Sequence, residues 1–144
     1  MKSQTFANHT RFFVPFHFVL LPVLLLGVIG AGVNLYESLG DSQRLYSASL
    51  ILLITMCLMG MSLFARVFAL KAQDRGIRAE ENLRHYVLAG KLIDPRVTTR
   101  QIVGLRFAPD DEFIELTAKA AETGMPEADI KKAIKNWRAD WYRA

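Results

Sequence analysis

The sequence predicts an all-α protein in which a transmembrane helical hairpin carries a small helical tail. Two long apolar runs occupy the first half: residues 12–36 contain no Asp, Glu, Lys or Arg, and neither do residues 45–65. About 20 apolar residues are enough for a helix to cross the hydrocarbon core of a bilayer. Charged residues become frequent after position 65, where apolar residues recur at helical spacing. We therefore expect two membrane spans followed by helices outside the membrane.

Charge placement predicts how the hairpin is inserted. The N-terminal arm, residues 1–11, carries Lys2 and Arg11, whereas the loop at residues 37–44 carries one net negative charge. Residues 66–90 hold five bases and three acids. Basic residues beside membrane spans favour the cytoplasmic side. We expect both termini in the cytoplasm and the eight-residue loop on the far side, with membrane lipids and other transmembrane helices as partners of the hairpin.

The first span, residues 12–36, contains the one histidine of either apolar run, His17. Ionisable groups inside a membrane are functional candidates, and an imidazole nitrogen can ligate the metal of a haem-type or chlorophyll-type cofactor. However, His17 lies only five residues into the run, where it can remain partly hydrated. We favour a structural or interfacial role for His17 and expect no bound cofactor.

Proline and small residues shape the same span. Pro22 has no backbone N–H and crowds the carbonyl of Phe18, which predicts a kink. Gly27 and Ala31 are spaced four apart, an arrangement that lets another helix approach closely. One pair of helices cannot cover all of its own apolar surface, so lipid or partner helices should cover the remainder.

Residues 66–90 predict a juxtamembrane helix that continues the second span. They contain no proline and one internal glycine, and Gly90 suits a helix C-terminus. Acid-first i,i+4 pairs support the helix, namely Asp74 with Arg78, Glu80 with Arg84, and Glu81 with His85. The tail is expected to dock on this helix or on the membrane surface, and a modest apolar edge that could receive it is formed by Gly76, Ala79, Leu83, Tyr86 and Val87.

Residues 91–144 predict three short helices. A capping box at residues 98–101 starts the first, Pro109 and the acids at 110–112 start the second, and Gly124 ends it. Their apolar stripes comprise Ile102 and Leu105, then Phe113, Leu116 and Ala120. The last helix starts near Pro126, and its apolar series is Ile130, Ala133, Ile134, Trp137 and Trp141. We expect Trp137 in the core and leave open whether Trp141 packs in the tail or anchors a partner.

Motifs for catalysis are missing from the sequence. The histidines are scattered at positions 9, 17 and 85, the single cysteine is Cys57, and no glycine-rich phosphate loop is present. We predict no enzyme activity, no metal site and no small-molecule substrate. A basic stripe in the last segment, Lys131, Lys132, Lys135 and Arg138, is a feature also found at nucleic-acid contacts, but residues 91–144 carry a net charge of only +1. We expect no nucleic-acid partner, because DNA-binding domains are normally strongly basic.

Five stretches in a fixed order carry a resemblance to a known family: residues 6–11 (FANHTR), 15–18 (PFHF), 73–81 (QDRGIRAEE), 105–111 (LRFAPDD) and 130–140 (IKKAIKNWRAD). The chain resembles an uncharacterised family of small bacterial two-span membrane proteins, a domain of unknown function. The resemblance implies a bacterial inner-membrane protein with this layout and no transferable activity. The recurring polar positions it implies are Asn8, His9, Arg11, His17, Gln73, Asp74, Arg75, Arg78, Glu81, Arg106, Trp137, Arg138 and Asp140.

The functional hypothesis is a non-enzymatic membrane interaction protein, either an accessory or structural subunit of a larger membrane assembly or a homo-oligomer. One alternative is a membrane-tethered regulator whose tail binds a soluble partner or nucleic acid. Another is a cofactor-binding subunit of an electron-transfer or light-harvesting complex, acting through His17. The residues we expect to serve partner contacts or structural contacts are Asn8, His9, Arg11, Gly27, Ala31, Arg75, Arg78, Glu81, Arg106, Trp137, Arg138 and Trp141.

Overall fold

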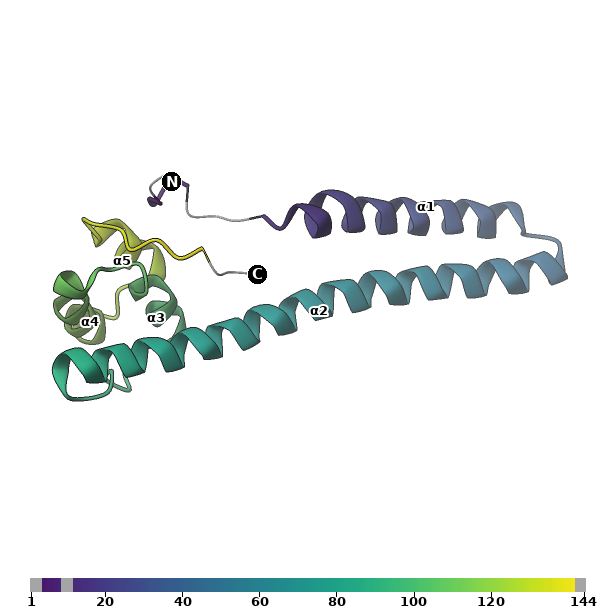
Figure 1. Cartoon of the computed structure of the whole chain (residues 1–144). Coiled ribbons are helices and arrows are strands. Elements are labelled where there is room, and N and C mark those ends of the chain that lie inside the picture. The colour runs from purple at the N-terminus through teal and green to yellow at the C-terminus, as the bar shows by residue number, and fades with distance from the viewer. Residues whose placement is uncertain (1–3, 9–11, 142–144) are drawn as a thin grey trace. The chain divides into compact units, whose positions relative to one another are not determined.

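The computed structural model describes residues 4–8 and 12–141, and these residues form helices and connecting turns with no strand among them (Figure 1). A π-helical segment, η1 (Pro15–Leu20), leads into α1 (Leu21–Glu37). The long helix α2 (Ser42–Ala89) follows, and then three short helices, α3 (Thr99–Leu105), α4 (Asp110–Thr123) and α5 (Glu127–Ala133). The prediction of an all-helical chain is confirmed.

The chain divides into two compact units. The first, here called the hairpin unit, comprises residues 12–69; the second, the tail unit, comprises residues 70–144 together with the N-terminal arm. The arm was predicted as a separate segment, yet it groups with the tail. Helix α2 contributes residues to both units, and it continues from Ser42 to Ala89 without interruption.

Both predicted spans are helical: η1 and α1 cover residues 15–36 of the first, and α2 covers all of residues 45–65. The helical stretch Pro15–Glu37 and the helix α2 are both long and apolar enough to cross a membrane. The connecting loop is shorter than the predicted eight residues, because α1 ends at Glu37 and α2 begins at Ser42. Asp41 accounts for this early start: its Oδ1 accepts the backbone N–H groups of Gln43 and Arg44 at 3.1 and 3.2 Å, as a helix N-cap does.

A π-helical segment precedes the proline that was expected to kink the first span. Pro22 is the second residue of α1, and η1 ends directly before that helix. A regular α-helix would set the Pro22 ring against the carbonyl of Phe18. The wider π-helical turns at Pro15–Leu20 are therefore located where the α-helical pattern would be sterically strained.

Small residues mark the inner faces of the hairpin helices. Ala31 of α1 and Ala48 of α2 are buried, as is Ser38 in the loop. Gly27 is exposed, and a Cβ there would meet no atom within 4 Å. Of the predicted small pair, only Ala31 is therefore used within the chain.

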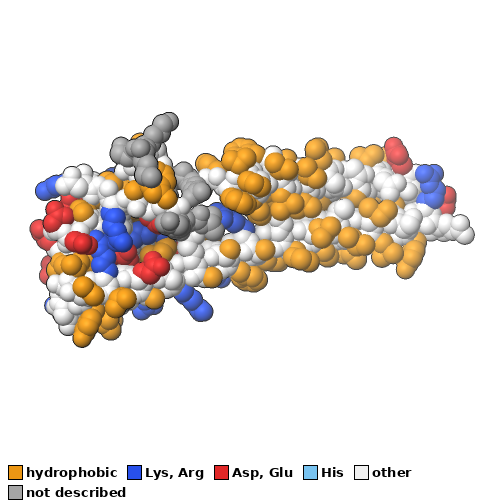
Figure 2. Space-filling model, in the orientation of Figure 1, with side chains coloured by type: hydrophobic (Ala, Val, Ile, Leu, Met, Phe, Trp, Pro, Cys, Tyr) orange, Lys and Arg blue, Asp and Glu red, His pale blue; other side chains and the backbone are white. Residues whose placement is uncertain are grey.

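Large apolar side chains cover the outside of the hairpin unit, as the orange surface in Figure 2 shows. Those on η1 and α1 include Phe18, Val23, Leu26, Ile29 and Val33, and those on α2 include Leu53, Ile54, Met56, Met61 and Phe64. Soluble monomers rarely leave so many large apolar side chains exposed together, because their contiguous apolar patches normally cover only a few hundred Å². The hairpin unit therefore lacks an apolar core of its own.

The tail unit has a continuous apolar core, around which α3, α4 and α5 gather against the C-terminal part of α2 (Figure 1). Local chemistry sets the helix ends as predicted. Thr98 and Gln101 form a reciprocal capping box at the start of α3, and Gly124 ends α4 in the left-handed conformation with φ 64°. The buried apolar residues are Ile77, Ile93, Val97, Ile102, Leu105, Phe107, Ala108, Phe113, Leu116, Ala120, Ile130 and Ile134.

The last helix ends earlier than the sequence predicts. The spacing of apolar residues indicated a helix reaching Trp141, but α5 ends at Ala133 and Ile134 is extended. The cause is a distant carboxylate. Glu112 accepts the backbone N–H groups of Lys135 and Asn136 at 2.9 and 3.0 Å, and these groups are then lost to a continuing helix.

The tail also packs on a different face of α2 from the one expected. The predicted apolar edge remains exposed: the exposed fractions of Leu83, Tyr86 and Val87 are 64%, 55% and 75%. The opposite face is buried instead, through Ile77 and His85. His85 Nδ1 lies 2.6 Å from the carbonyl oxygen of Lys91, so the chain after α2 folds back along the polar face.

Candidate interaction site

A buried carboxylate on α2 is the centre of the main polar cluster in the tail unit. Glu81 is 5% exposed although it is charged. Its Oε2 accepts a bond from Arg84 Nη1 at 2.9 Å, and its Oε1 lies 3.4 Å from Arg138 Nη1. Two guanidinium groups thus neutralise one buried acid, which is the condition under which a buried charge is tolerated.

Arg84 connects this carboxylate to the start of α4. Its guanidinium group bonds to Asp110 Oδ1 through Nε at 2.7 Å and to the carbonyl oxygen of Ala108 through Nη2 at 2.8 Å. The same group lies 4.2 Å from the ring centroid of Phe113. The i,i+4 pair predicted between Glu80 and Arg84 is therefore wrong, because Arg84 bonds to a nearer acid and to the loop before α4.

A second arginine, Arg106, holds the C-terminal segment. Its side chain is buried, its Nε lies 3.2 Å from Asp140 Oδ2, and its guanidinium group stacks 4.6 Å from the centroid of Phe107. The backbone N–H of Arg138 donates to the carbonyl oxygen of Phe107 at 2.8 Å. Residues 138–140 are thereby fixed against α3 without being helical.

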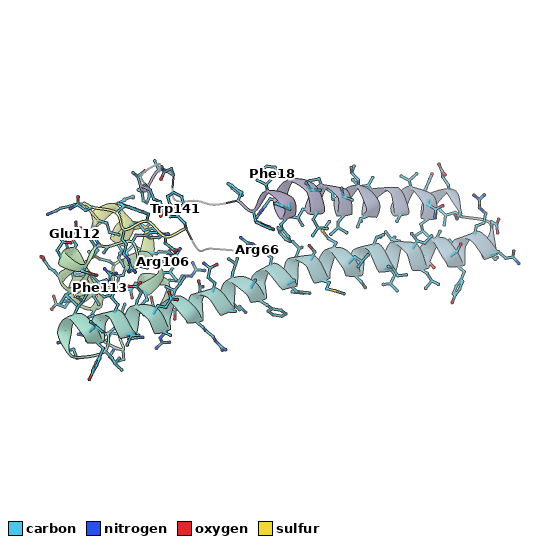
Figure 3. All side chains as sticks on the ribbon, in the orientation of Figure 1. Phe18, Arg66, Arg106, Glu112, Phe113 and Trp141 are labelled. Atoms are coloured by element: carbon cyan, nitrogen blue, oxygen red, sulfur yellow. The ribbon has the colours of Figure 1, made fainter. Side chains whose placement is uncertain are left out.

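These side chains surround a cavity of about 350 Å³. The lining combines two arginines with three acids and an exposed indole, and its members are Ile77, Glu80, Glu81, Arg106, Arg138, Ala139, Asp140 and Trp141. Figure 3 labels Arg106 and Trp141 in this unit. Since both charge signs are present in similar number, the cavity suits polar side chains of a partner rather than a strongly charged ligand.

Four residues that line the cavity were among the candidates predicted from the sequence: Glu81, Arg106, Arg138 and Trp141. A fifth candidate, Trp137, precedes the lining residue Arg138, and its ring centroid lies 4.9 Å from that of Phe107. The structure brings these five together, although they come from different parts of the sequence. Trp141 is 46% exposed and Trp137 is half-buried.

The remaining candidates lie elsewhere. Arg75 and Arg78 are exposed on α2, Gly27 and Ala31 belong to the hairpin unit, and His9 and Arg11 lie outside the described residues. Asn8 accepts bonds within the arm, from the backbone N–H of Thr5 at 2.6 Å and from its hydroxyl at 3.2 Å.

Two anchoring residues of the tail unit were missed by sequence reasoning. Gln4 is buried, and its Oε1 accepts the backbone N–H of Asp140 at 2.8 Å, which ties the N-terminal arm to the C-terminal segment. Glu112 was interpreted only as a favourable acid at a helix start. Neither contact leaves a local signal, because the partners are 136 and 23 or 24 residues apart.

His17 lies in η1 and forms a bond within its own helix. Its Nδ1 is 3.0 Å from the carbonyl oxygen of Phe13, so Nδ1 donates this hydrogen bond, and in a neutral imidazole Nε2 is then the acceptor. Phe12 and Phe16 approach the imidazole edge-on, with ring centroids at 5.4 and 5.1 Å. This tautomer suits a bond from a neighbouring helix, and it is also the form that a metal ligand requires.

An exposed ion pair stabilises the turn between α2 and α3. The side-chain hydrogen bonds from Arg96 hold the pKa of Asp94 at about 2, and the backbone N–H of Arg96 adds to the effect. The same hydrogen bonds raise the pKa of Arg96. The predicted turn at Asp94 and Pro95 is confirmed by the bond from Val97 N–H to the Asp94 carbonyl oxygen at 2.9 Å.

The fold and this site define an all-helical protein with two helices apolar enough to cross a membrane and a compact helical unit with a charged cavity. The chain belongs to DUF6526, described as a family of unknown function, whose family model matches residues 1–144. Neither the curated proteins nor the solved structures include a significant match. The resemblance to an uncharacterised family is thus confirmed.

Proposed function

We propose that the protein is a non-enzymatic integral membrane protein of the bacterial inner membrane that spans the bilayer twice and presents the tail unit to a protein partner. That partner is a larger membrane assembly, of which this chain is an accessory or structural subunit, or another copy of the chain. The observation that carries the proposal is the exposed apolar surface of the hairpin unit. In water such a surface is unfavourable by about 25 cal/mol per Å², whereas lipid tails or apolar helices cover it.

The topology proposed is two cytoplasmic termini. The bond from Asp140 N–H to Gln4 Oε1 joins the segment before the first span to the segment after the second. Two segments that touch must lie on one side of the membrane, as an even number of spans requires. This contact supports a common side for both termini, and the basic residues that flank the hairpin support the cytoplasm as that side.

The cavity around Glu81 and Arg106 is the proposed contact site for the assembly. Its polar lining and the exposed Trp141 resemble the composition of protein interfaces, in which Trp and Arg are enriched. A large aromatic beside paired charges offers both apolar area and hydrogen-bond partners. Trp141, which is 46% exposed, is accordingly the proposed aromatic anchor for a partner.

His17 supports a second candidate function, that of a cofactor-binding subunit. Its Nε2 is the nitrogen left to ligate a metal, because Nδ1 bonds to the Phe13 carbonyl oxygen. A visible absorption band in the purified protein that disappears in His17→Phe would establish it. A colourless protein would rule out the cofactor, and a lower yield of His17→Phe would then indicate a structural role for His17.

Topology is tested with cysteines placed in a Cys57→Ser background. Ser42→Cys should react with a membrane-impermeant maleimide in cells with a permeabilised outer membrane. Glu115→Cys, on the exposed face of α4, should react only after the inner membrane is opened. The opposite pattern would contradict the proposed orientation, and extraction of the chain by alkaline carbonate would contradict membrane insertion itself.

A further inference from the structure

We propose that the exposed face of α2 in the tail unit is a dimerisation surface, on which a second copy of the chain packs its own α2 in parallel. This inference rests on the proposed membrane function and names the partner. The residues that carry it, here called the heptad face, are Ala72, Gly76, Ala79, Leu83 and Tyr86. All five are exposed.

The heptad face has the spacing of a coiled-coil seam. Its members follow one another by four, three, four and three residues, as the a and d positions of a heptad repeat do. The tail core uses the other side of the helix, through Ile77 and Glu81. Residues 72–86 also lie beyond the apolar run 45–65 and among charged residues, so lipid does not cover this face.

Gly76 indicates that another backbone approaches this face closely. A glycine inside a helix is destabilising relative to alanine, because it has more backbone freedom to lose. Nothing within the described chain requires it, since a Cβ at Gly76 would meet no atom within 4 Å and its φ is not positive. A second helix crossing at this point would use the missing side chain.

Charges beside the heptad face match a parallel second copy. Arg75 and Glu80 flank the face on opposite sides, are both exposed, and form no ion pair within the described part of the chain. In a parallel coiled coil, residue i of one helix faces residue i+5 of the other. Arg75 of each copy thus meets Glu80 of the other, which gives two symmetric ion pairs.

An antiparallel arrangement would instead bring equivalent flanks together, so that arginine flanks arginine and glutamate flanks glutamate. Two chains inserted the same way in one membrane can present α2 only in parallel. The charges therefore favour the parallel arrangement, which is also the arrangement that insertion into one membrane requires. Such agreement is specific to a second copy, because an unrelated partner has no reason to match the sign and spacing of both flanks.

Cysteine cross-linking of the full chain in its own membranes tests the contact. In a Cys57→Ser background, Ala79→Cys should form an intermolecular disulfide on mild oxidation, since a residue on a two-fold seam meets itself. Arg78→Cys is the matched control, one residue away and also exposed but turned by 100° from the seam. Equal cross-linking of both variants, or none at Ala79→Cys, would overturn the proposal.

Charge exchange tests the specificity of the pairing. Arg75→Glu and Glu80→Arg should each raise the dimer dissociation constant in detergent about tenfold, because two exposed ion pairs become repulsive. The double variant should return it to near the parent value. A double variant that is weaker than either single variant would contradict the parallel register.

Membrane extraction separates this inference from the proposed function. A chain that resists alkaline carbonate yet remains monomeric by cross-linking would refute the dimer and leave the membrane function standing. A chain released by carbonate would refute the membrane function first. Tryptophan fluorescence confirms folding of each variant, because both tryptophans lie in the tail unit.

Discussion

The two units of this protein are built from similar helices but bury opposite kinds of surface. In the tail unit the largest apolar side chains, such as Phe107 and Phe113, are fully buried, and charged groups such as Glu81 are paired around them. In the hairpin unit the buried positions are small, such as Ala31 and Ala48, and the large residues face outward. The tail unit therefore supplies its own apolar environment, whereas the hairpin unit requires one from outside.

The largest expected effect contrasts one phenylalanine from each unit. Phe113→Ala should destabilise the tail unit by about 3–5 kcal/mol, because it removes a fully buried ring that also stacks on Arg84. Phe64→Ala is the control in the hairpin unit, where the ring is 64% exposed, and it should leave tail stability unchanged. Urea unfolding in mild detergent, followed by tryptophan fluorescence, measures both. A stable Phe113→Ala tail would show that the core assignment is wrong.

A smaller effect is expected at the buried carboxylate. Glu81→Gln should lower the free energy of unfolding of the tail unit by about 2–3 kcal/mol, because Arg84 and Arg138 lose their charged acceptor. Glu115→Gln replaces an exposed acid of α4 and should change the free energy of unfolding by no more than about 0.5 kcal/mol. The same fluorescence-detected unfolding applies. Equal free energies of unfolding for the two variants would mean that the ion pairs of Glu81 do not stabilise the tail unit.

The contact that ends α5 should contribute still less. Glu112→Gln weakens the hydrogen bonds from the N–H groups of Lys135 and Asn136. It should therefore lower the free energy of unfolding by about 1–2 kcal/mol. Faster hydrogen exchange of those two amides is the direct readout, with Glu122→Gln, an exposed acid later in α4, as the control. Protection unchanged from the parent protein would contradict this explanation for the early end of the helix.

The smallest effect concerns pH. The pKa of Asp94 is lowered to about 2 by Arg96, so this ion pair stabilises the tail above the unfolded-state pKa of about 3.9 and is lost as the pH falls through 2. Asp94→Asn should remove that part of the acid sensitivity between about pH 4 and pH 2. Because the pair is exposed, 1 M salt should weaken it. An Asp94 carboxyl that titrates near pH 4 by NMR would refute the contact.

Local sequence predicted much of the helical framework because helix ends depend on neighbouring residues. The capping box at Thr98, the left-handed glycines at positions 90 and 124, and the apolar runs all act over a few residues. The end of α5 could not be predicted this way, since the carboxylate of Glu112 lies more than twenty residues upstream. Apolar spacing alone indicated a helix through Trp141.

The candidate site was predictable only as a set of residue types. Sequence reasoning selected Glu81, Arg106 and Arg138, but their meeting around one cavity depends on how the tail folds back on α2. The choice of face was wrong for the same reason. Leu83 and Tyr86 form the more apolar edge, yet hydrogen bonds from the chain after α2 to the polar face, including Ile93 N–H to Asn82 Oδ1 at 3.2 Å, place the tail on the other side.

The reactivity of the native cysteine tests the central difference between the units most directly. Cys57 is exposed in the structure, although it lies within the second apolar run. If the bilayer covers the hairpin unit, a membrane-impermeant maleimide should fail to label Cys57 in open membrane fragments and should label it fully after denaturation in SDS. Glu115→Cys, exposed on the tail unit, should label in both conditions. Labelling of Cys57 in native membranes at the rate of Glu115→Cys would contradict the account.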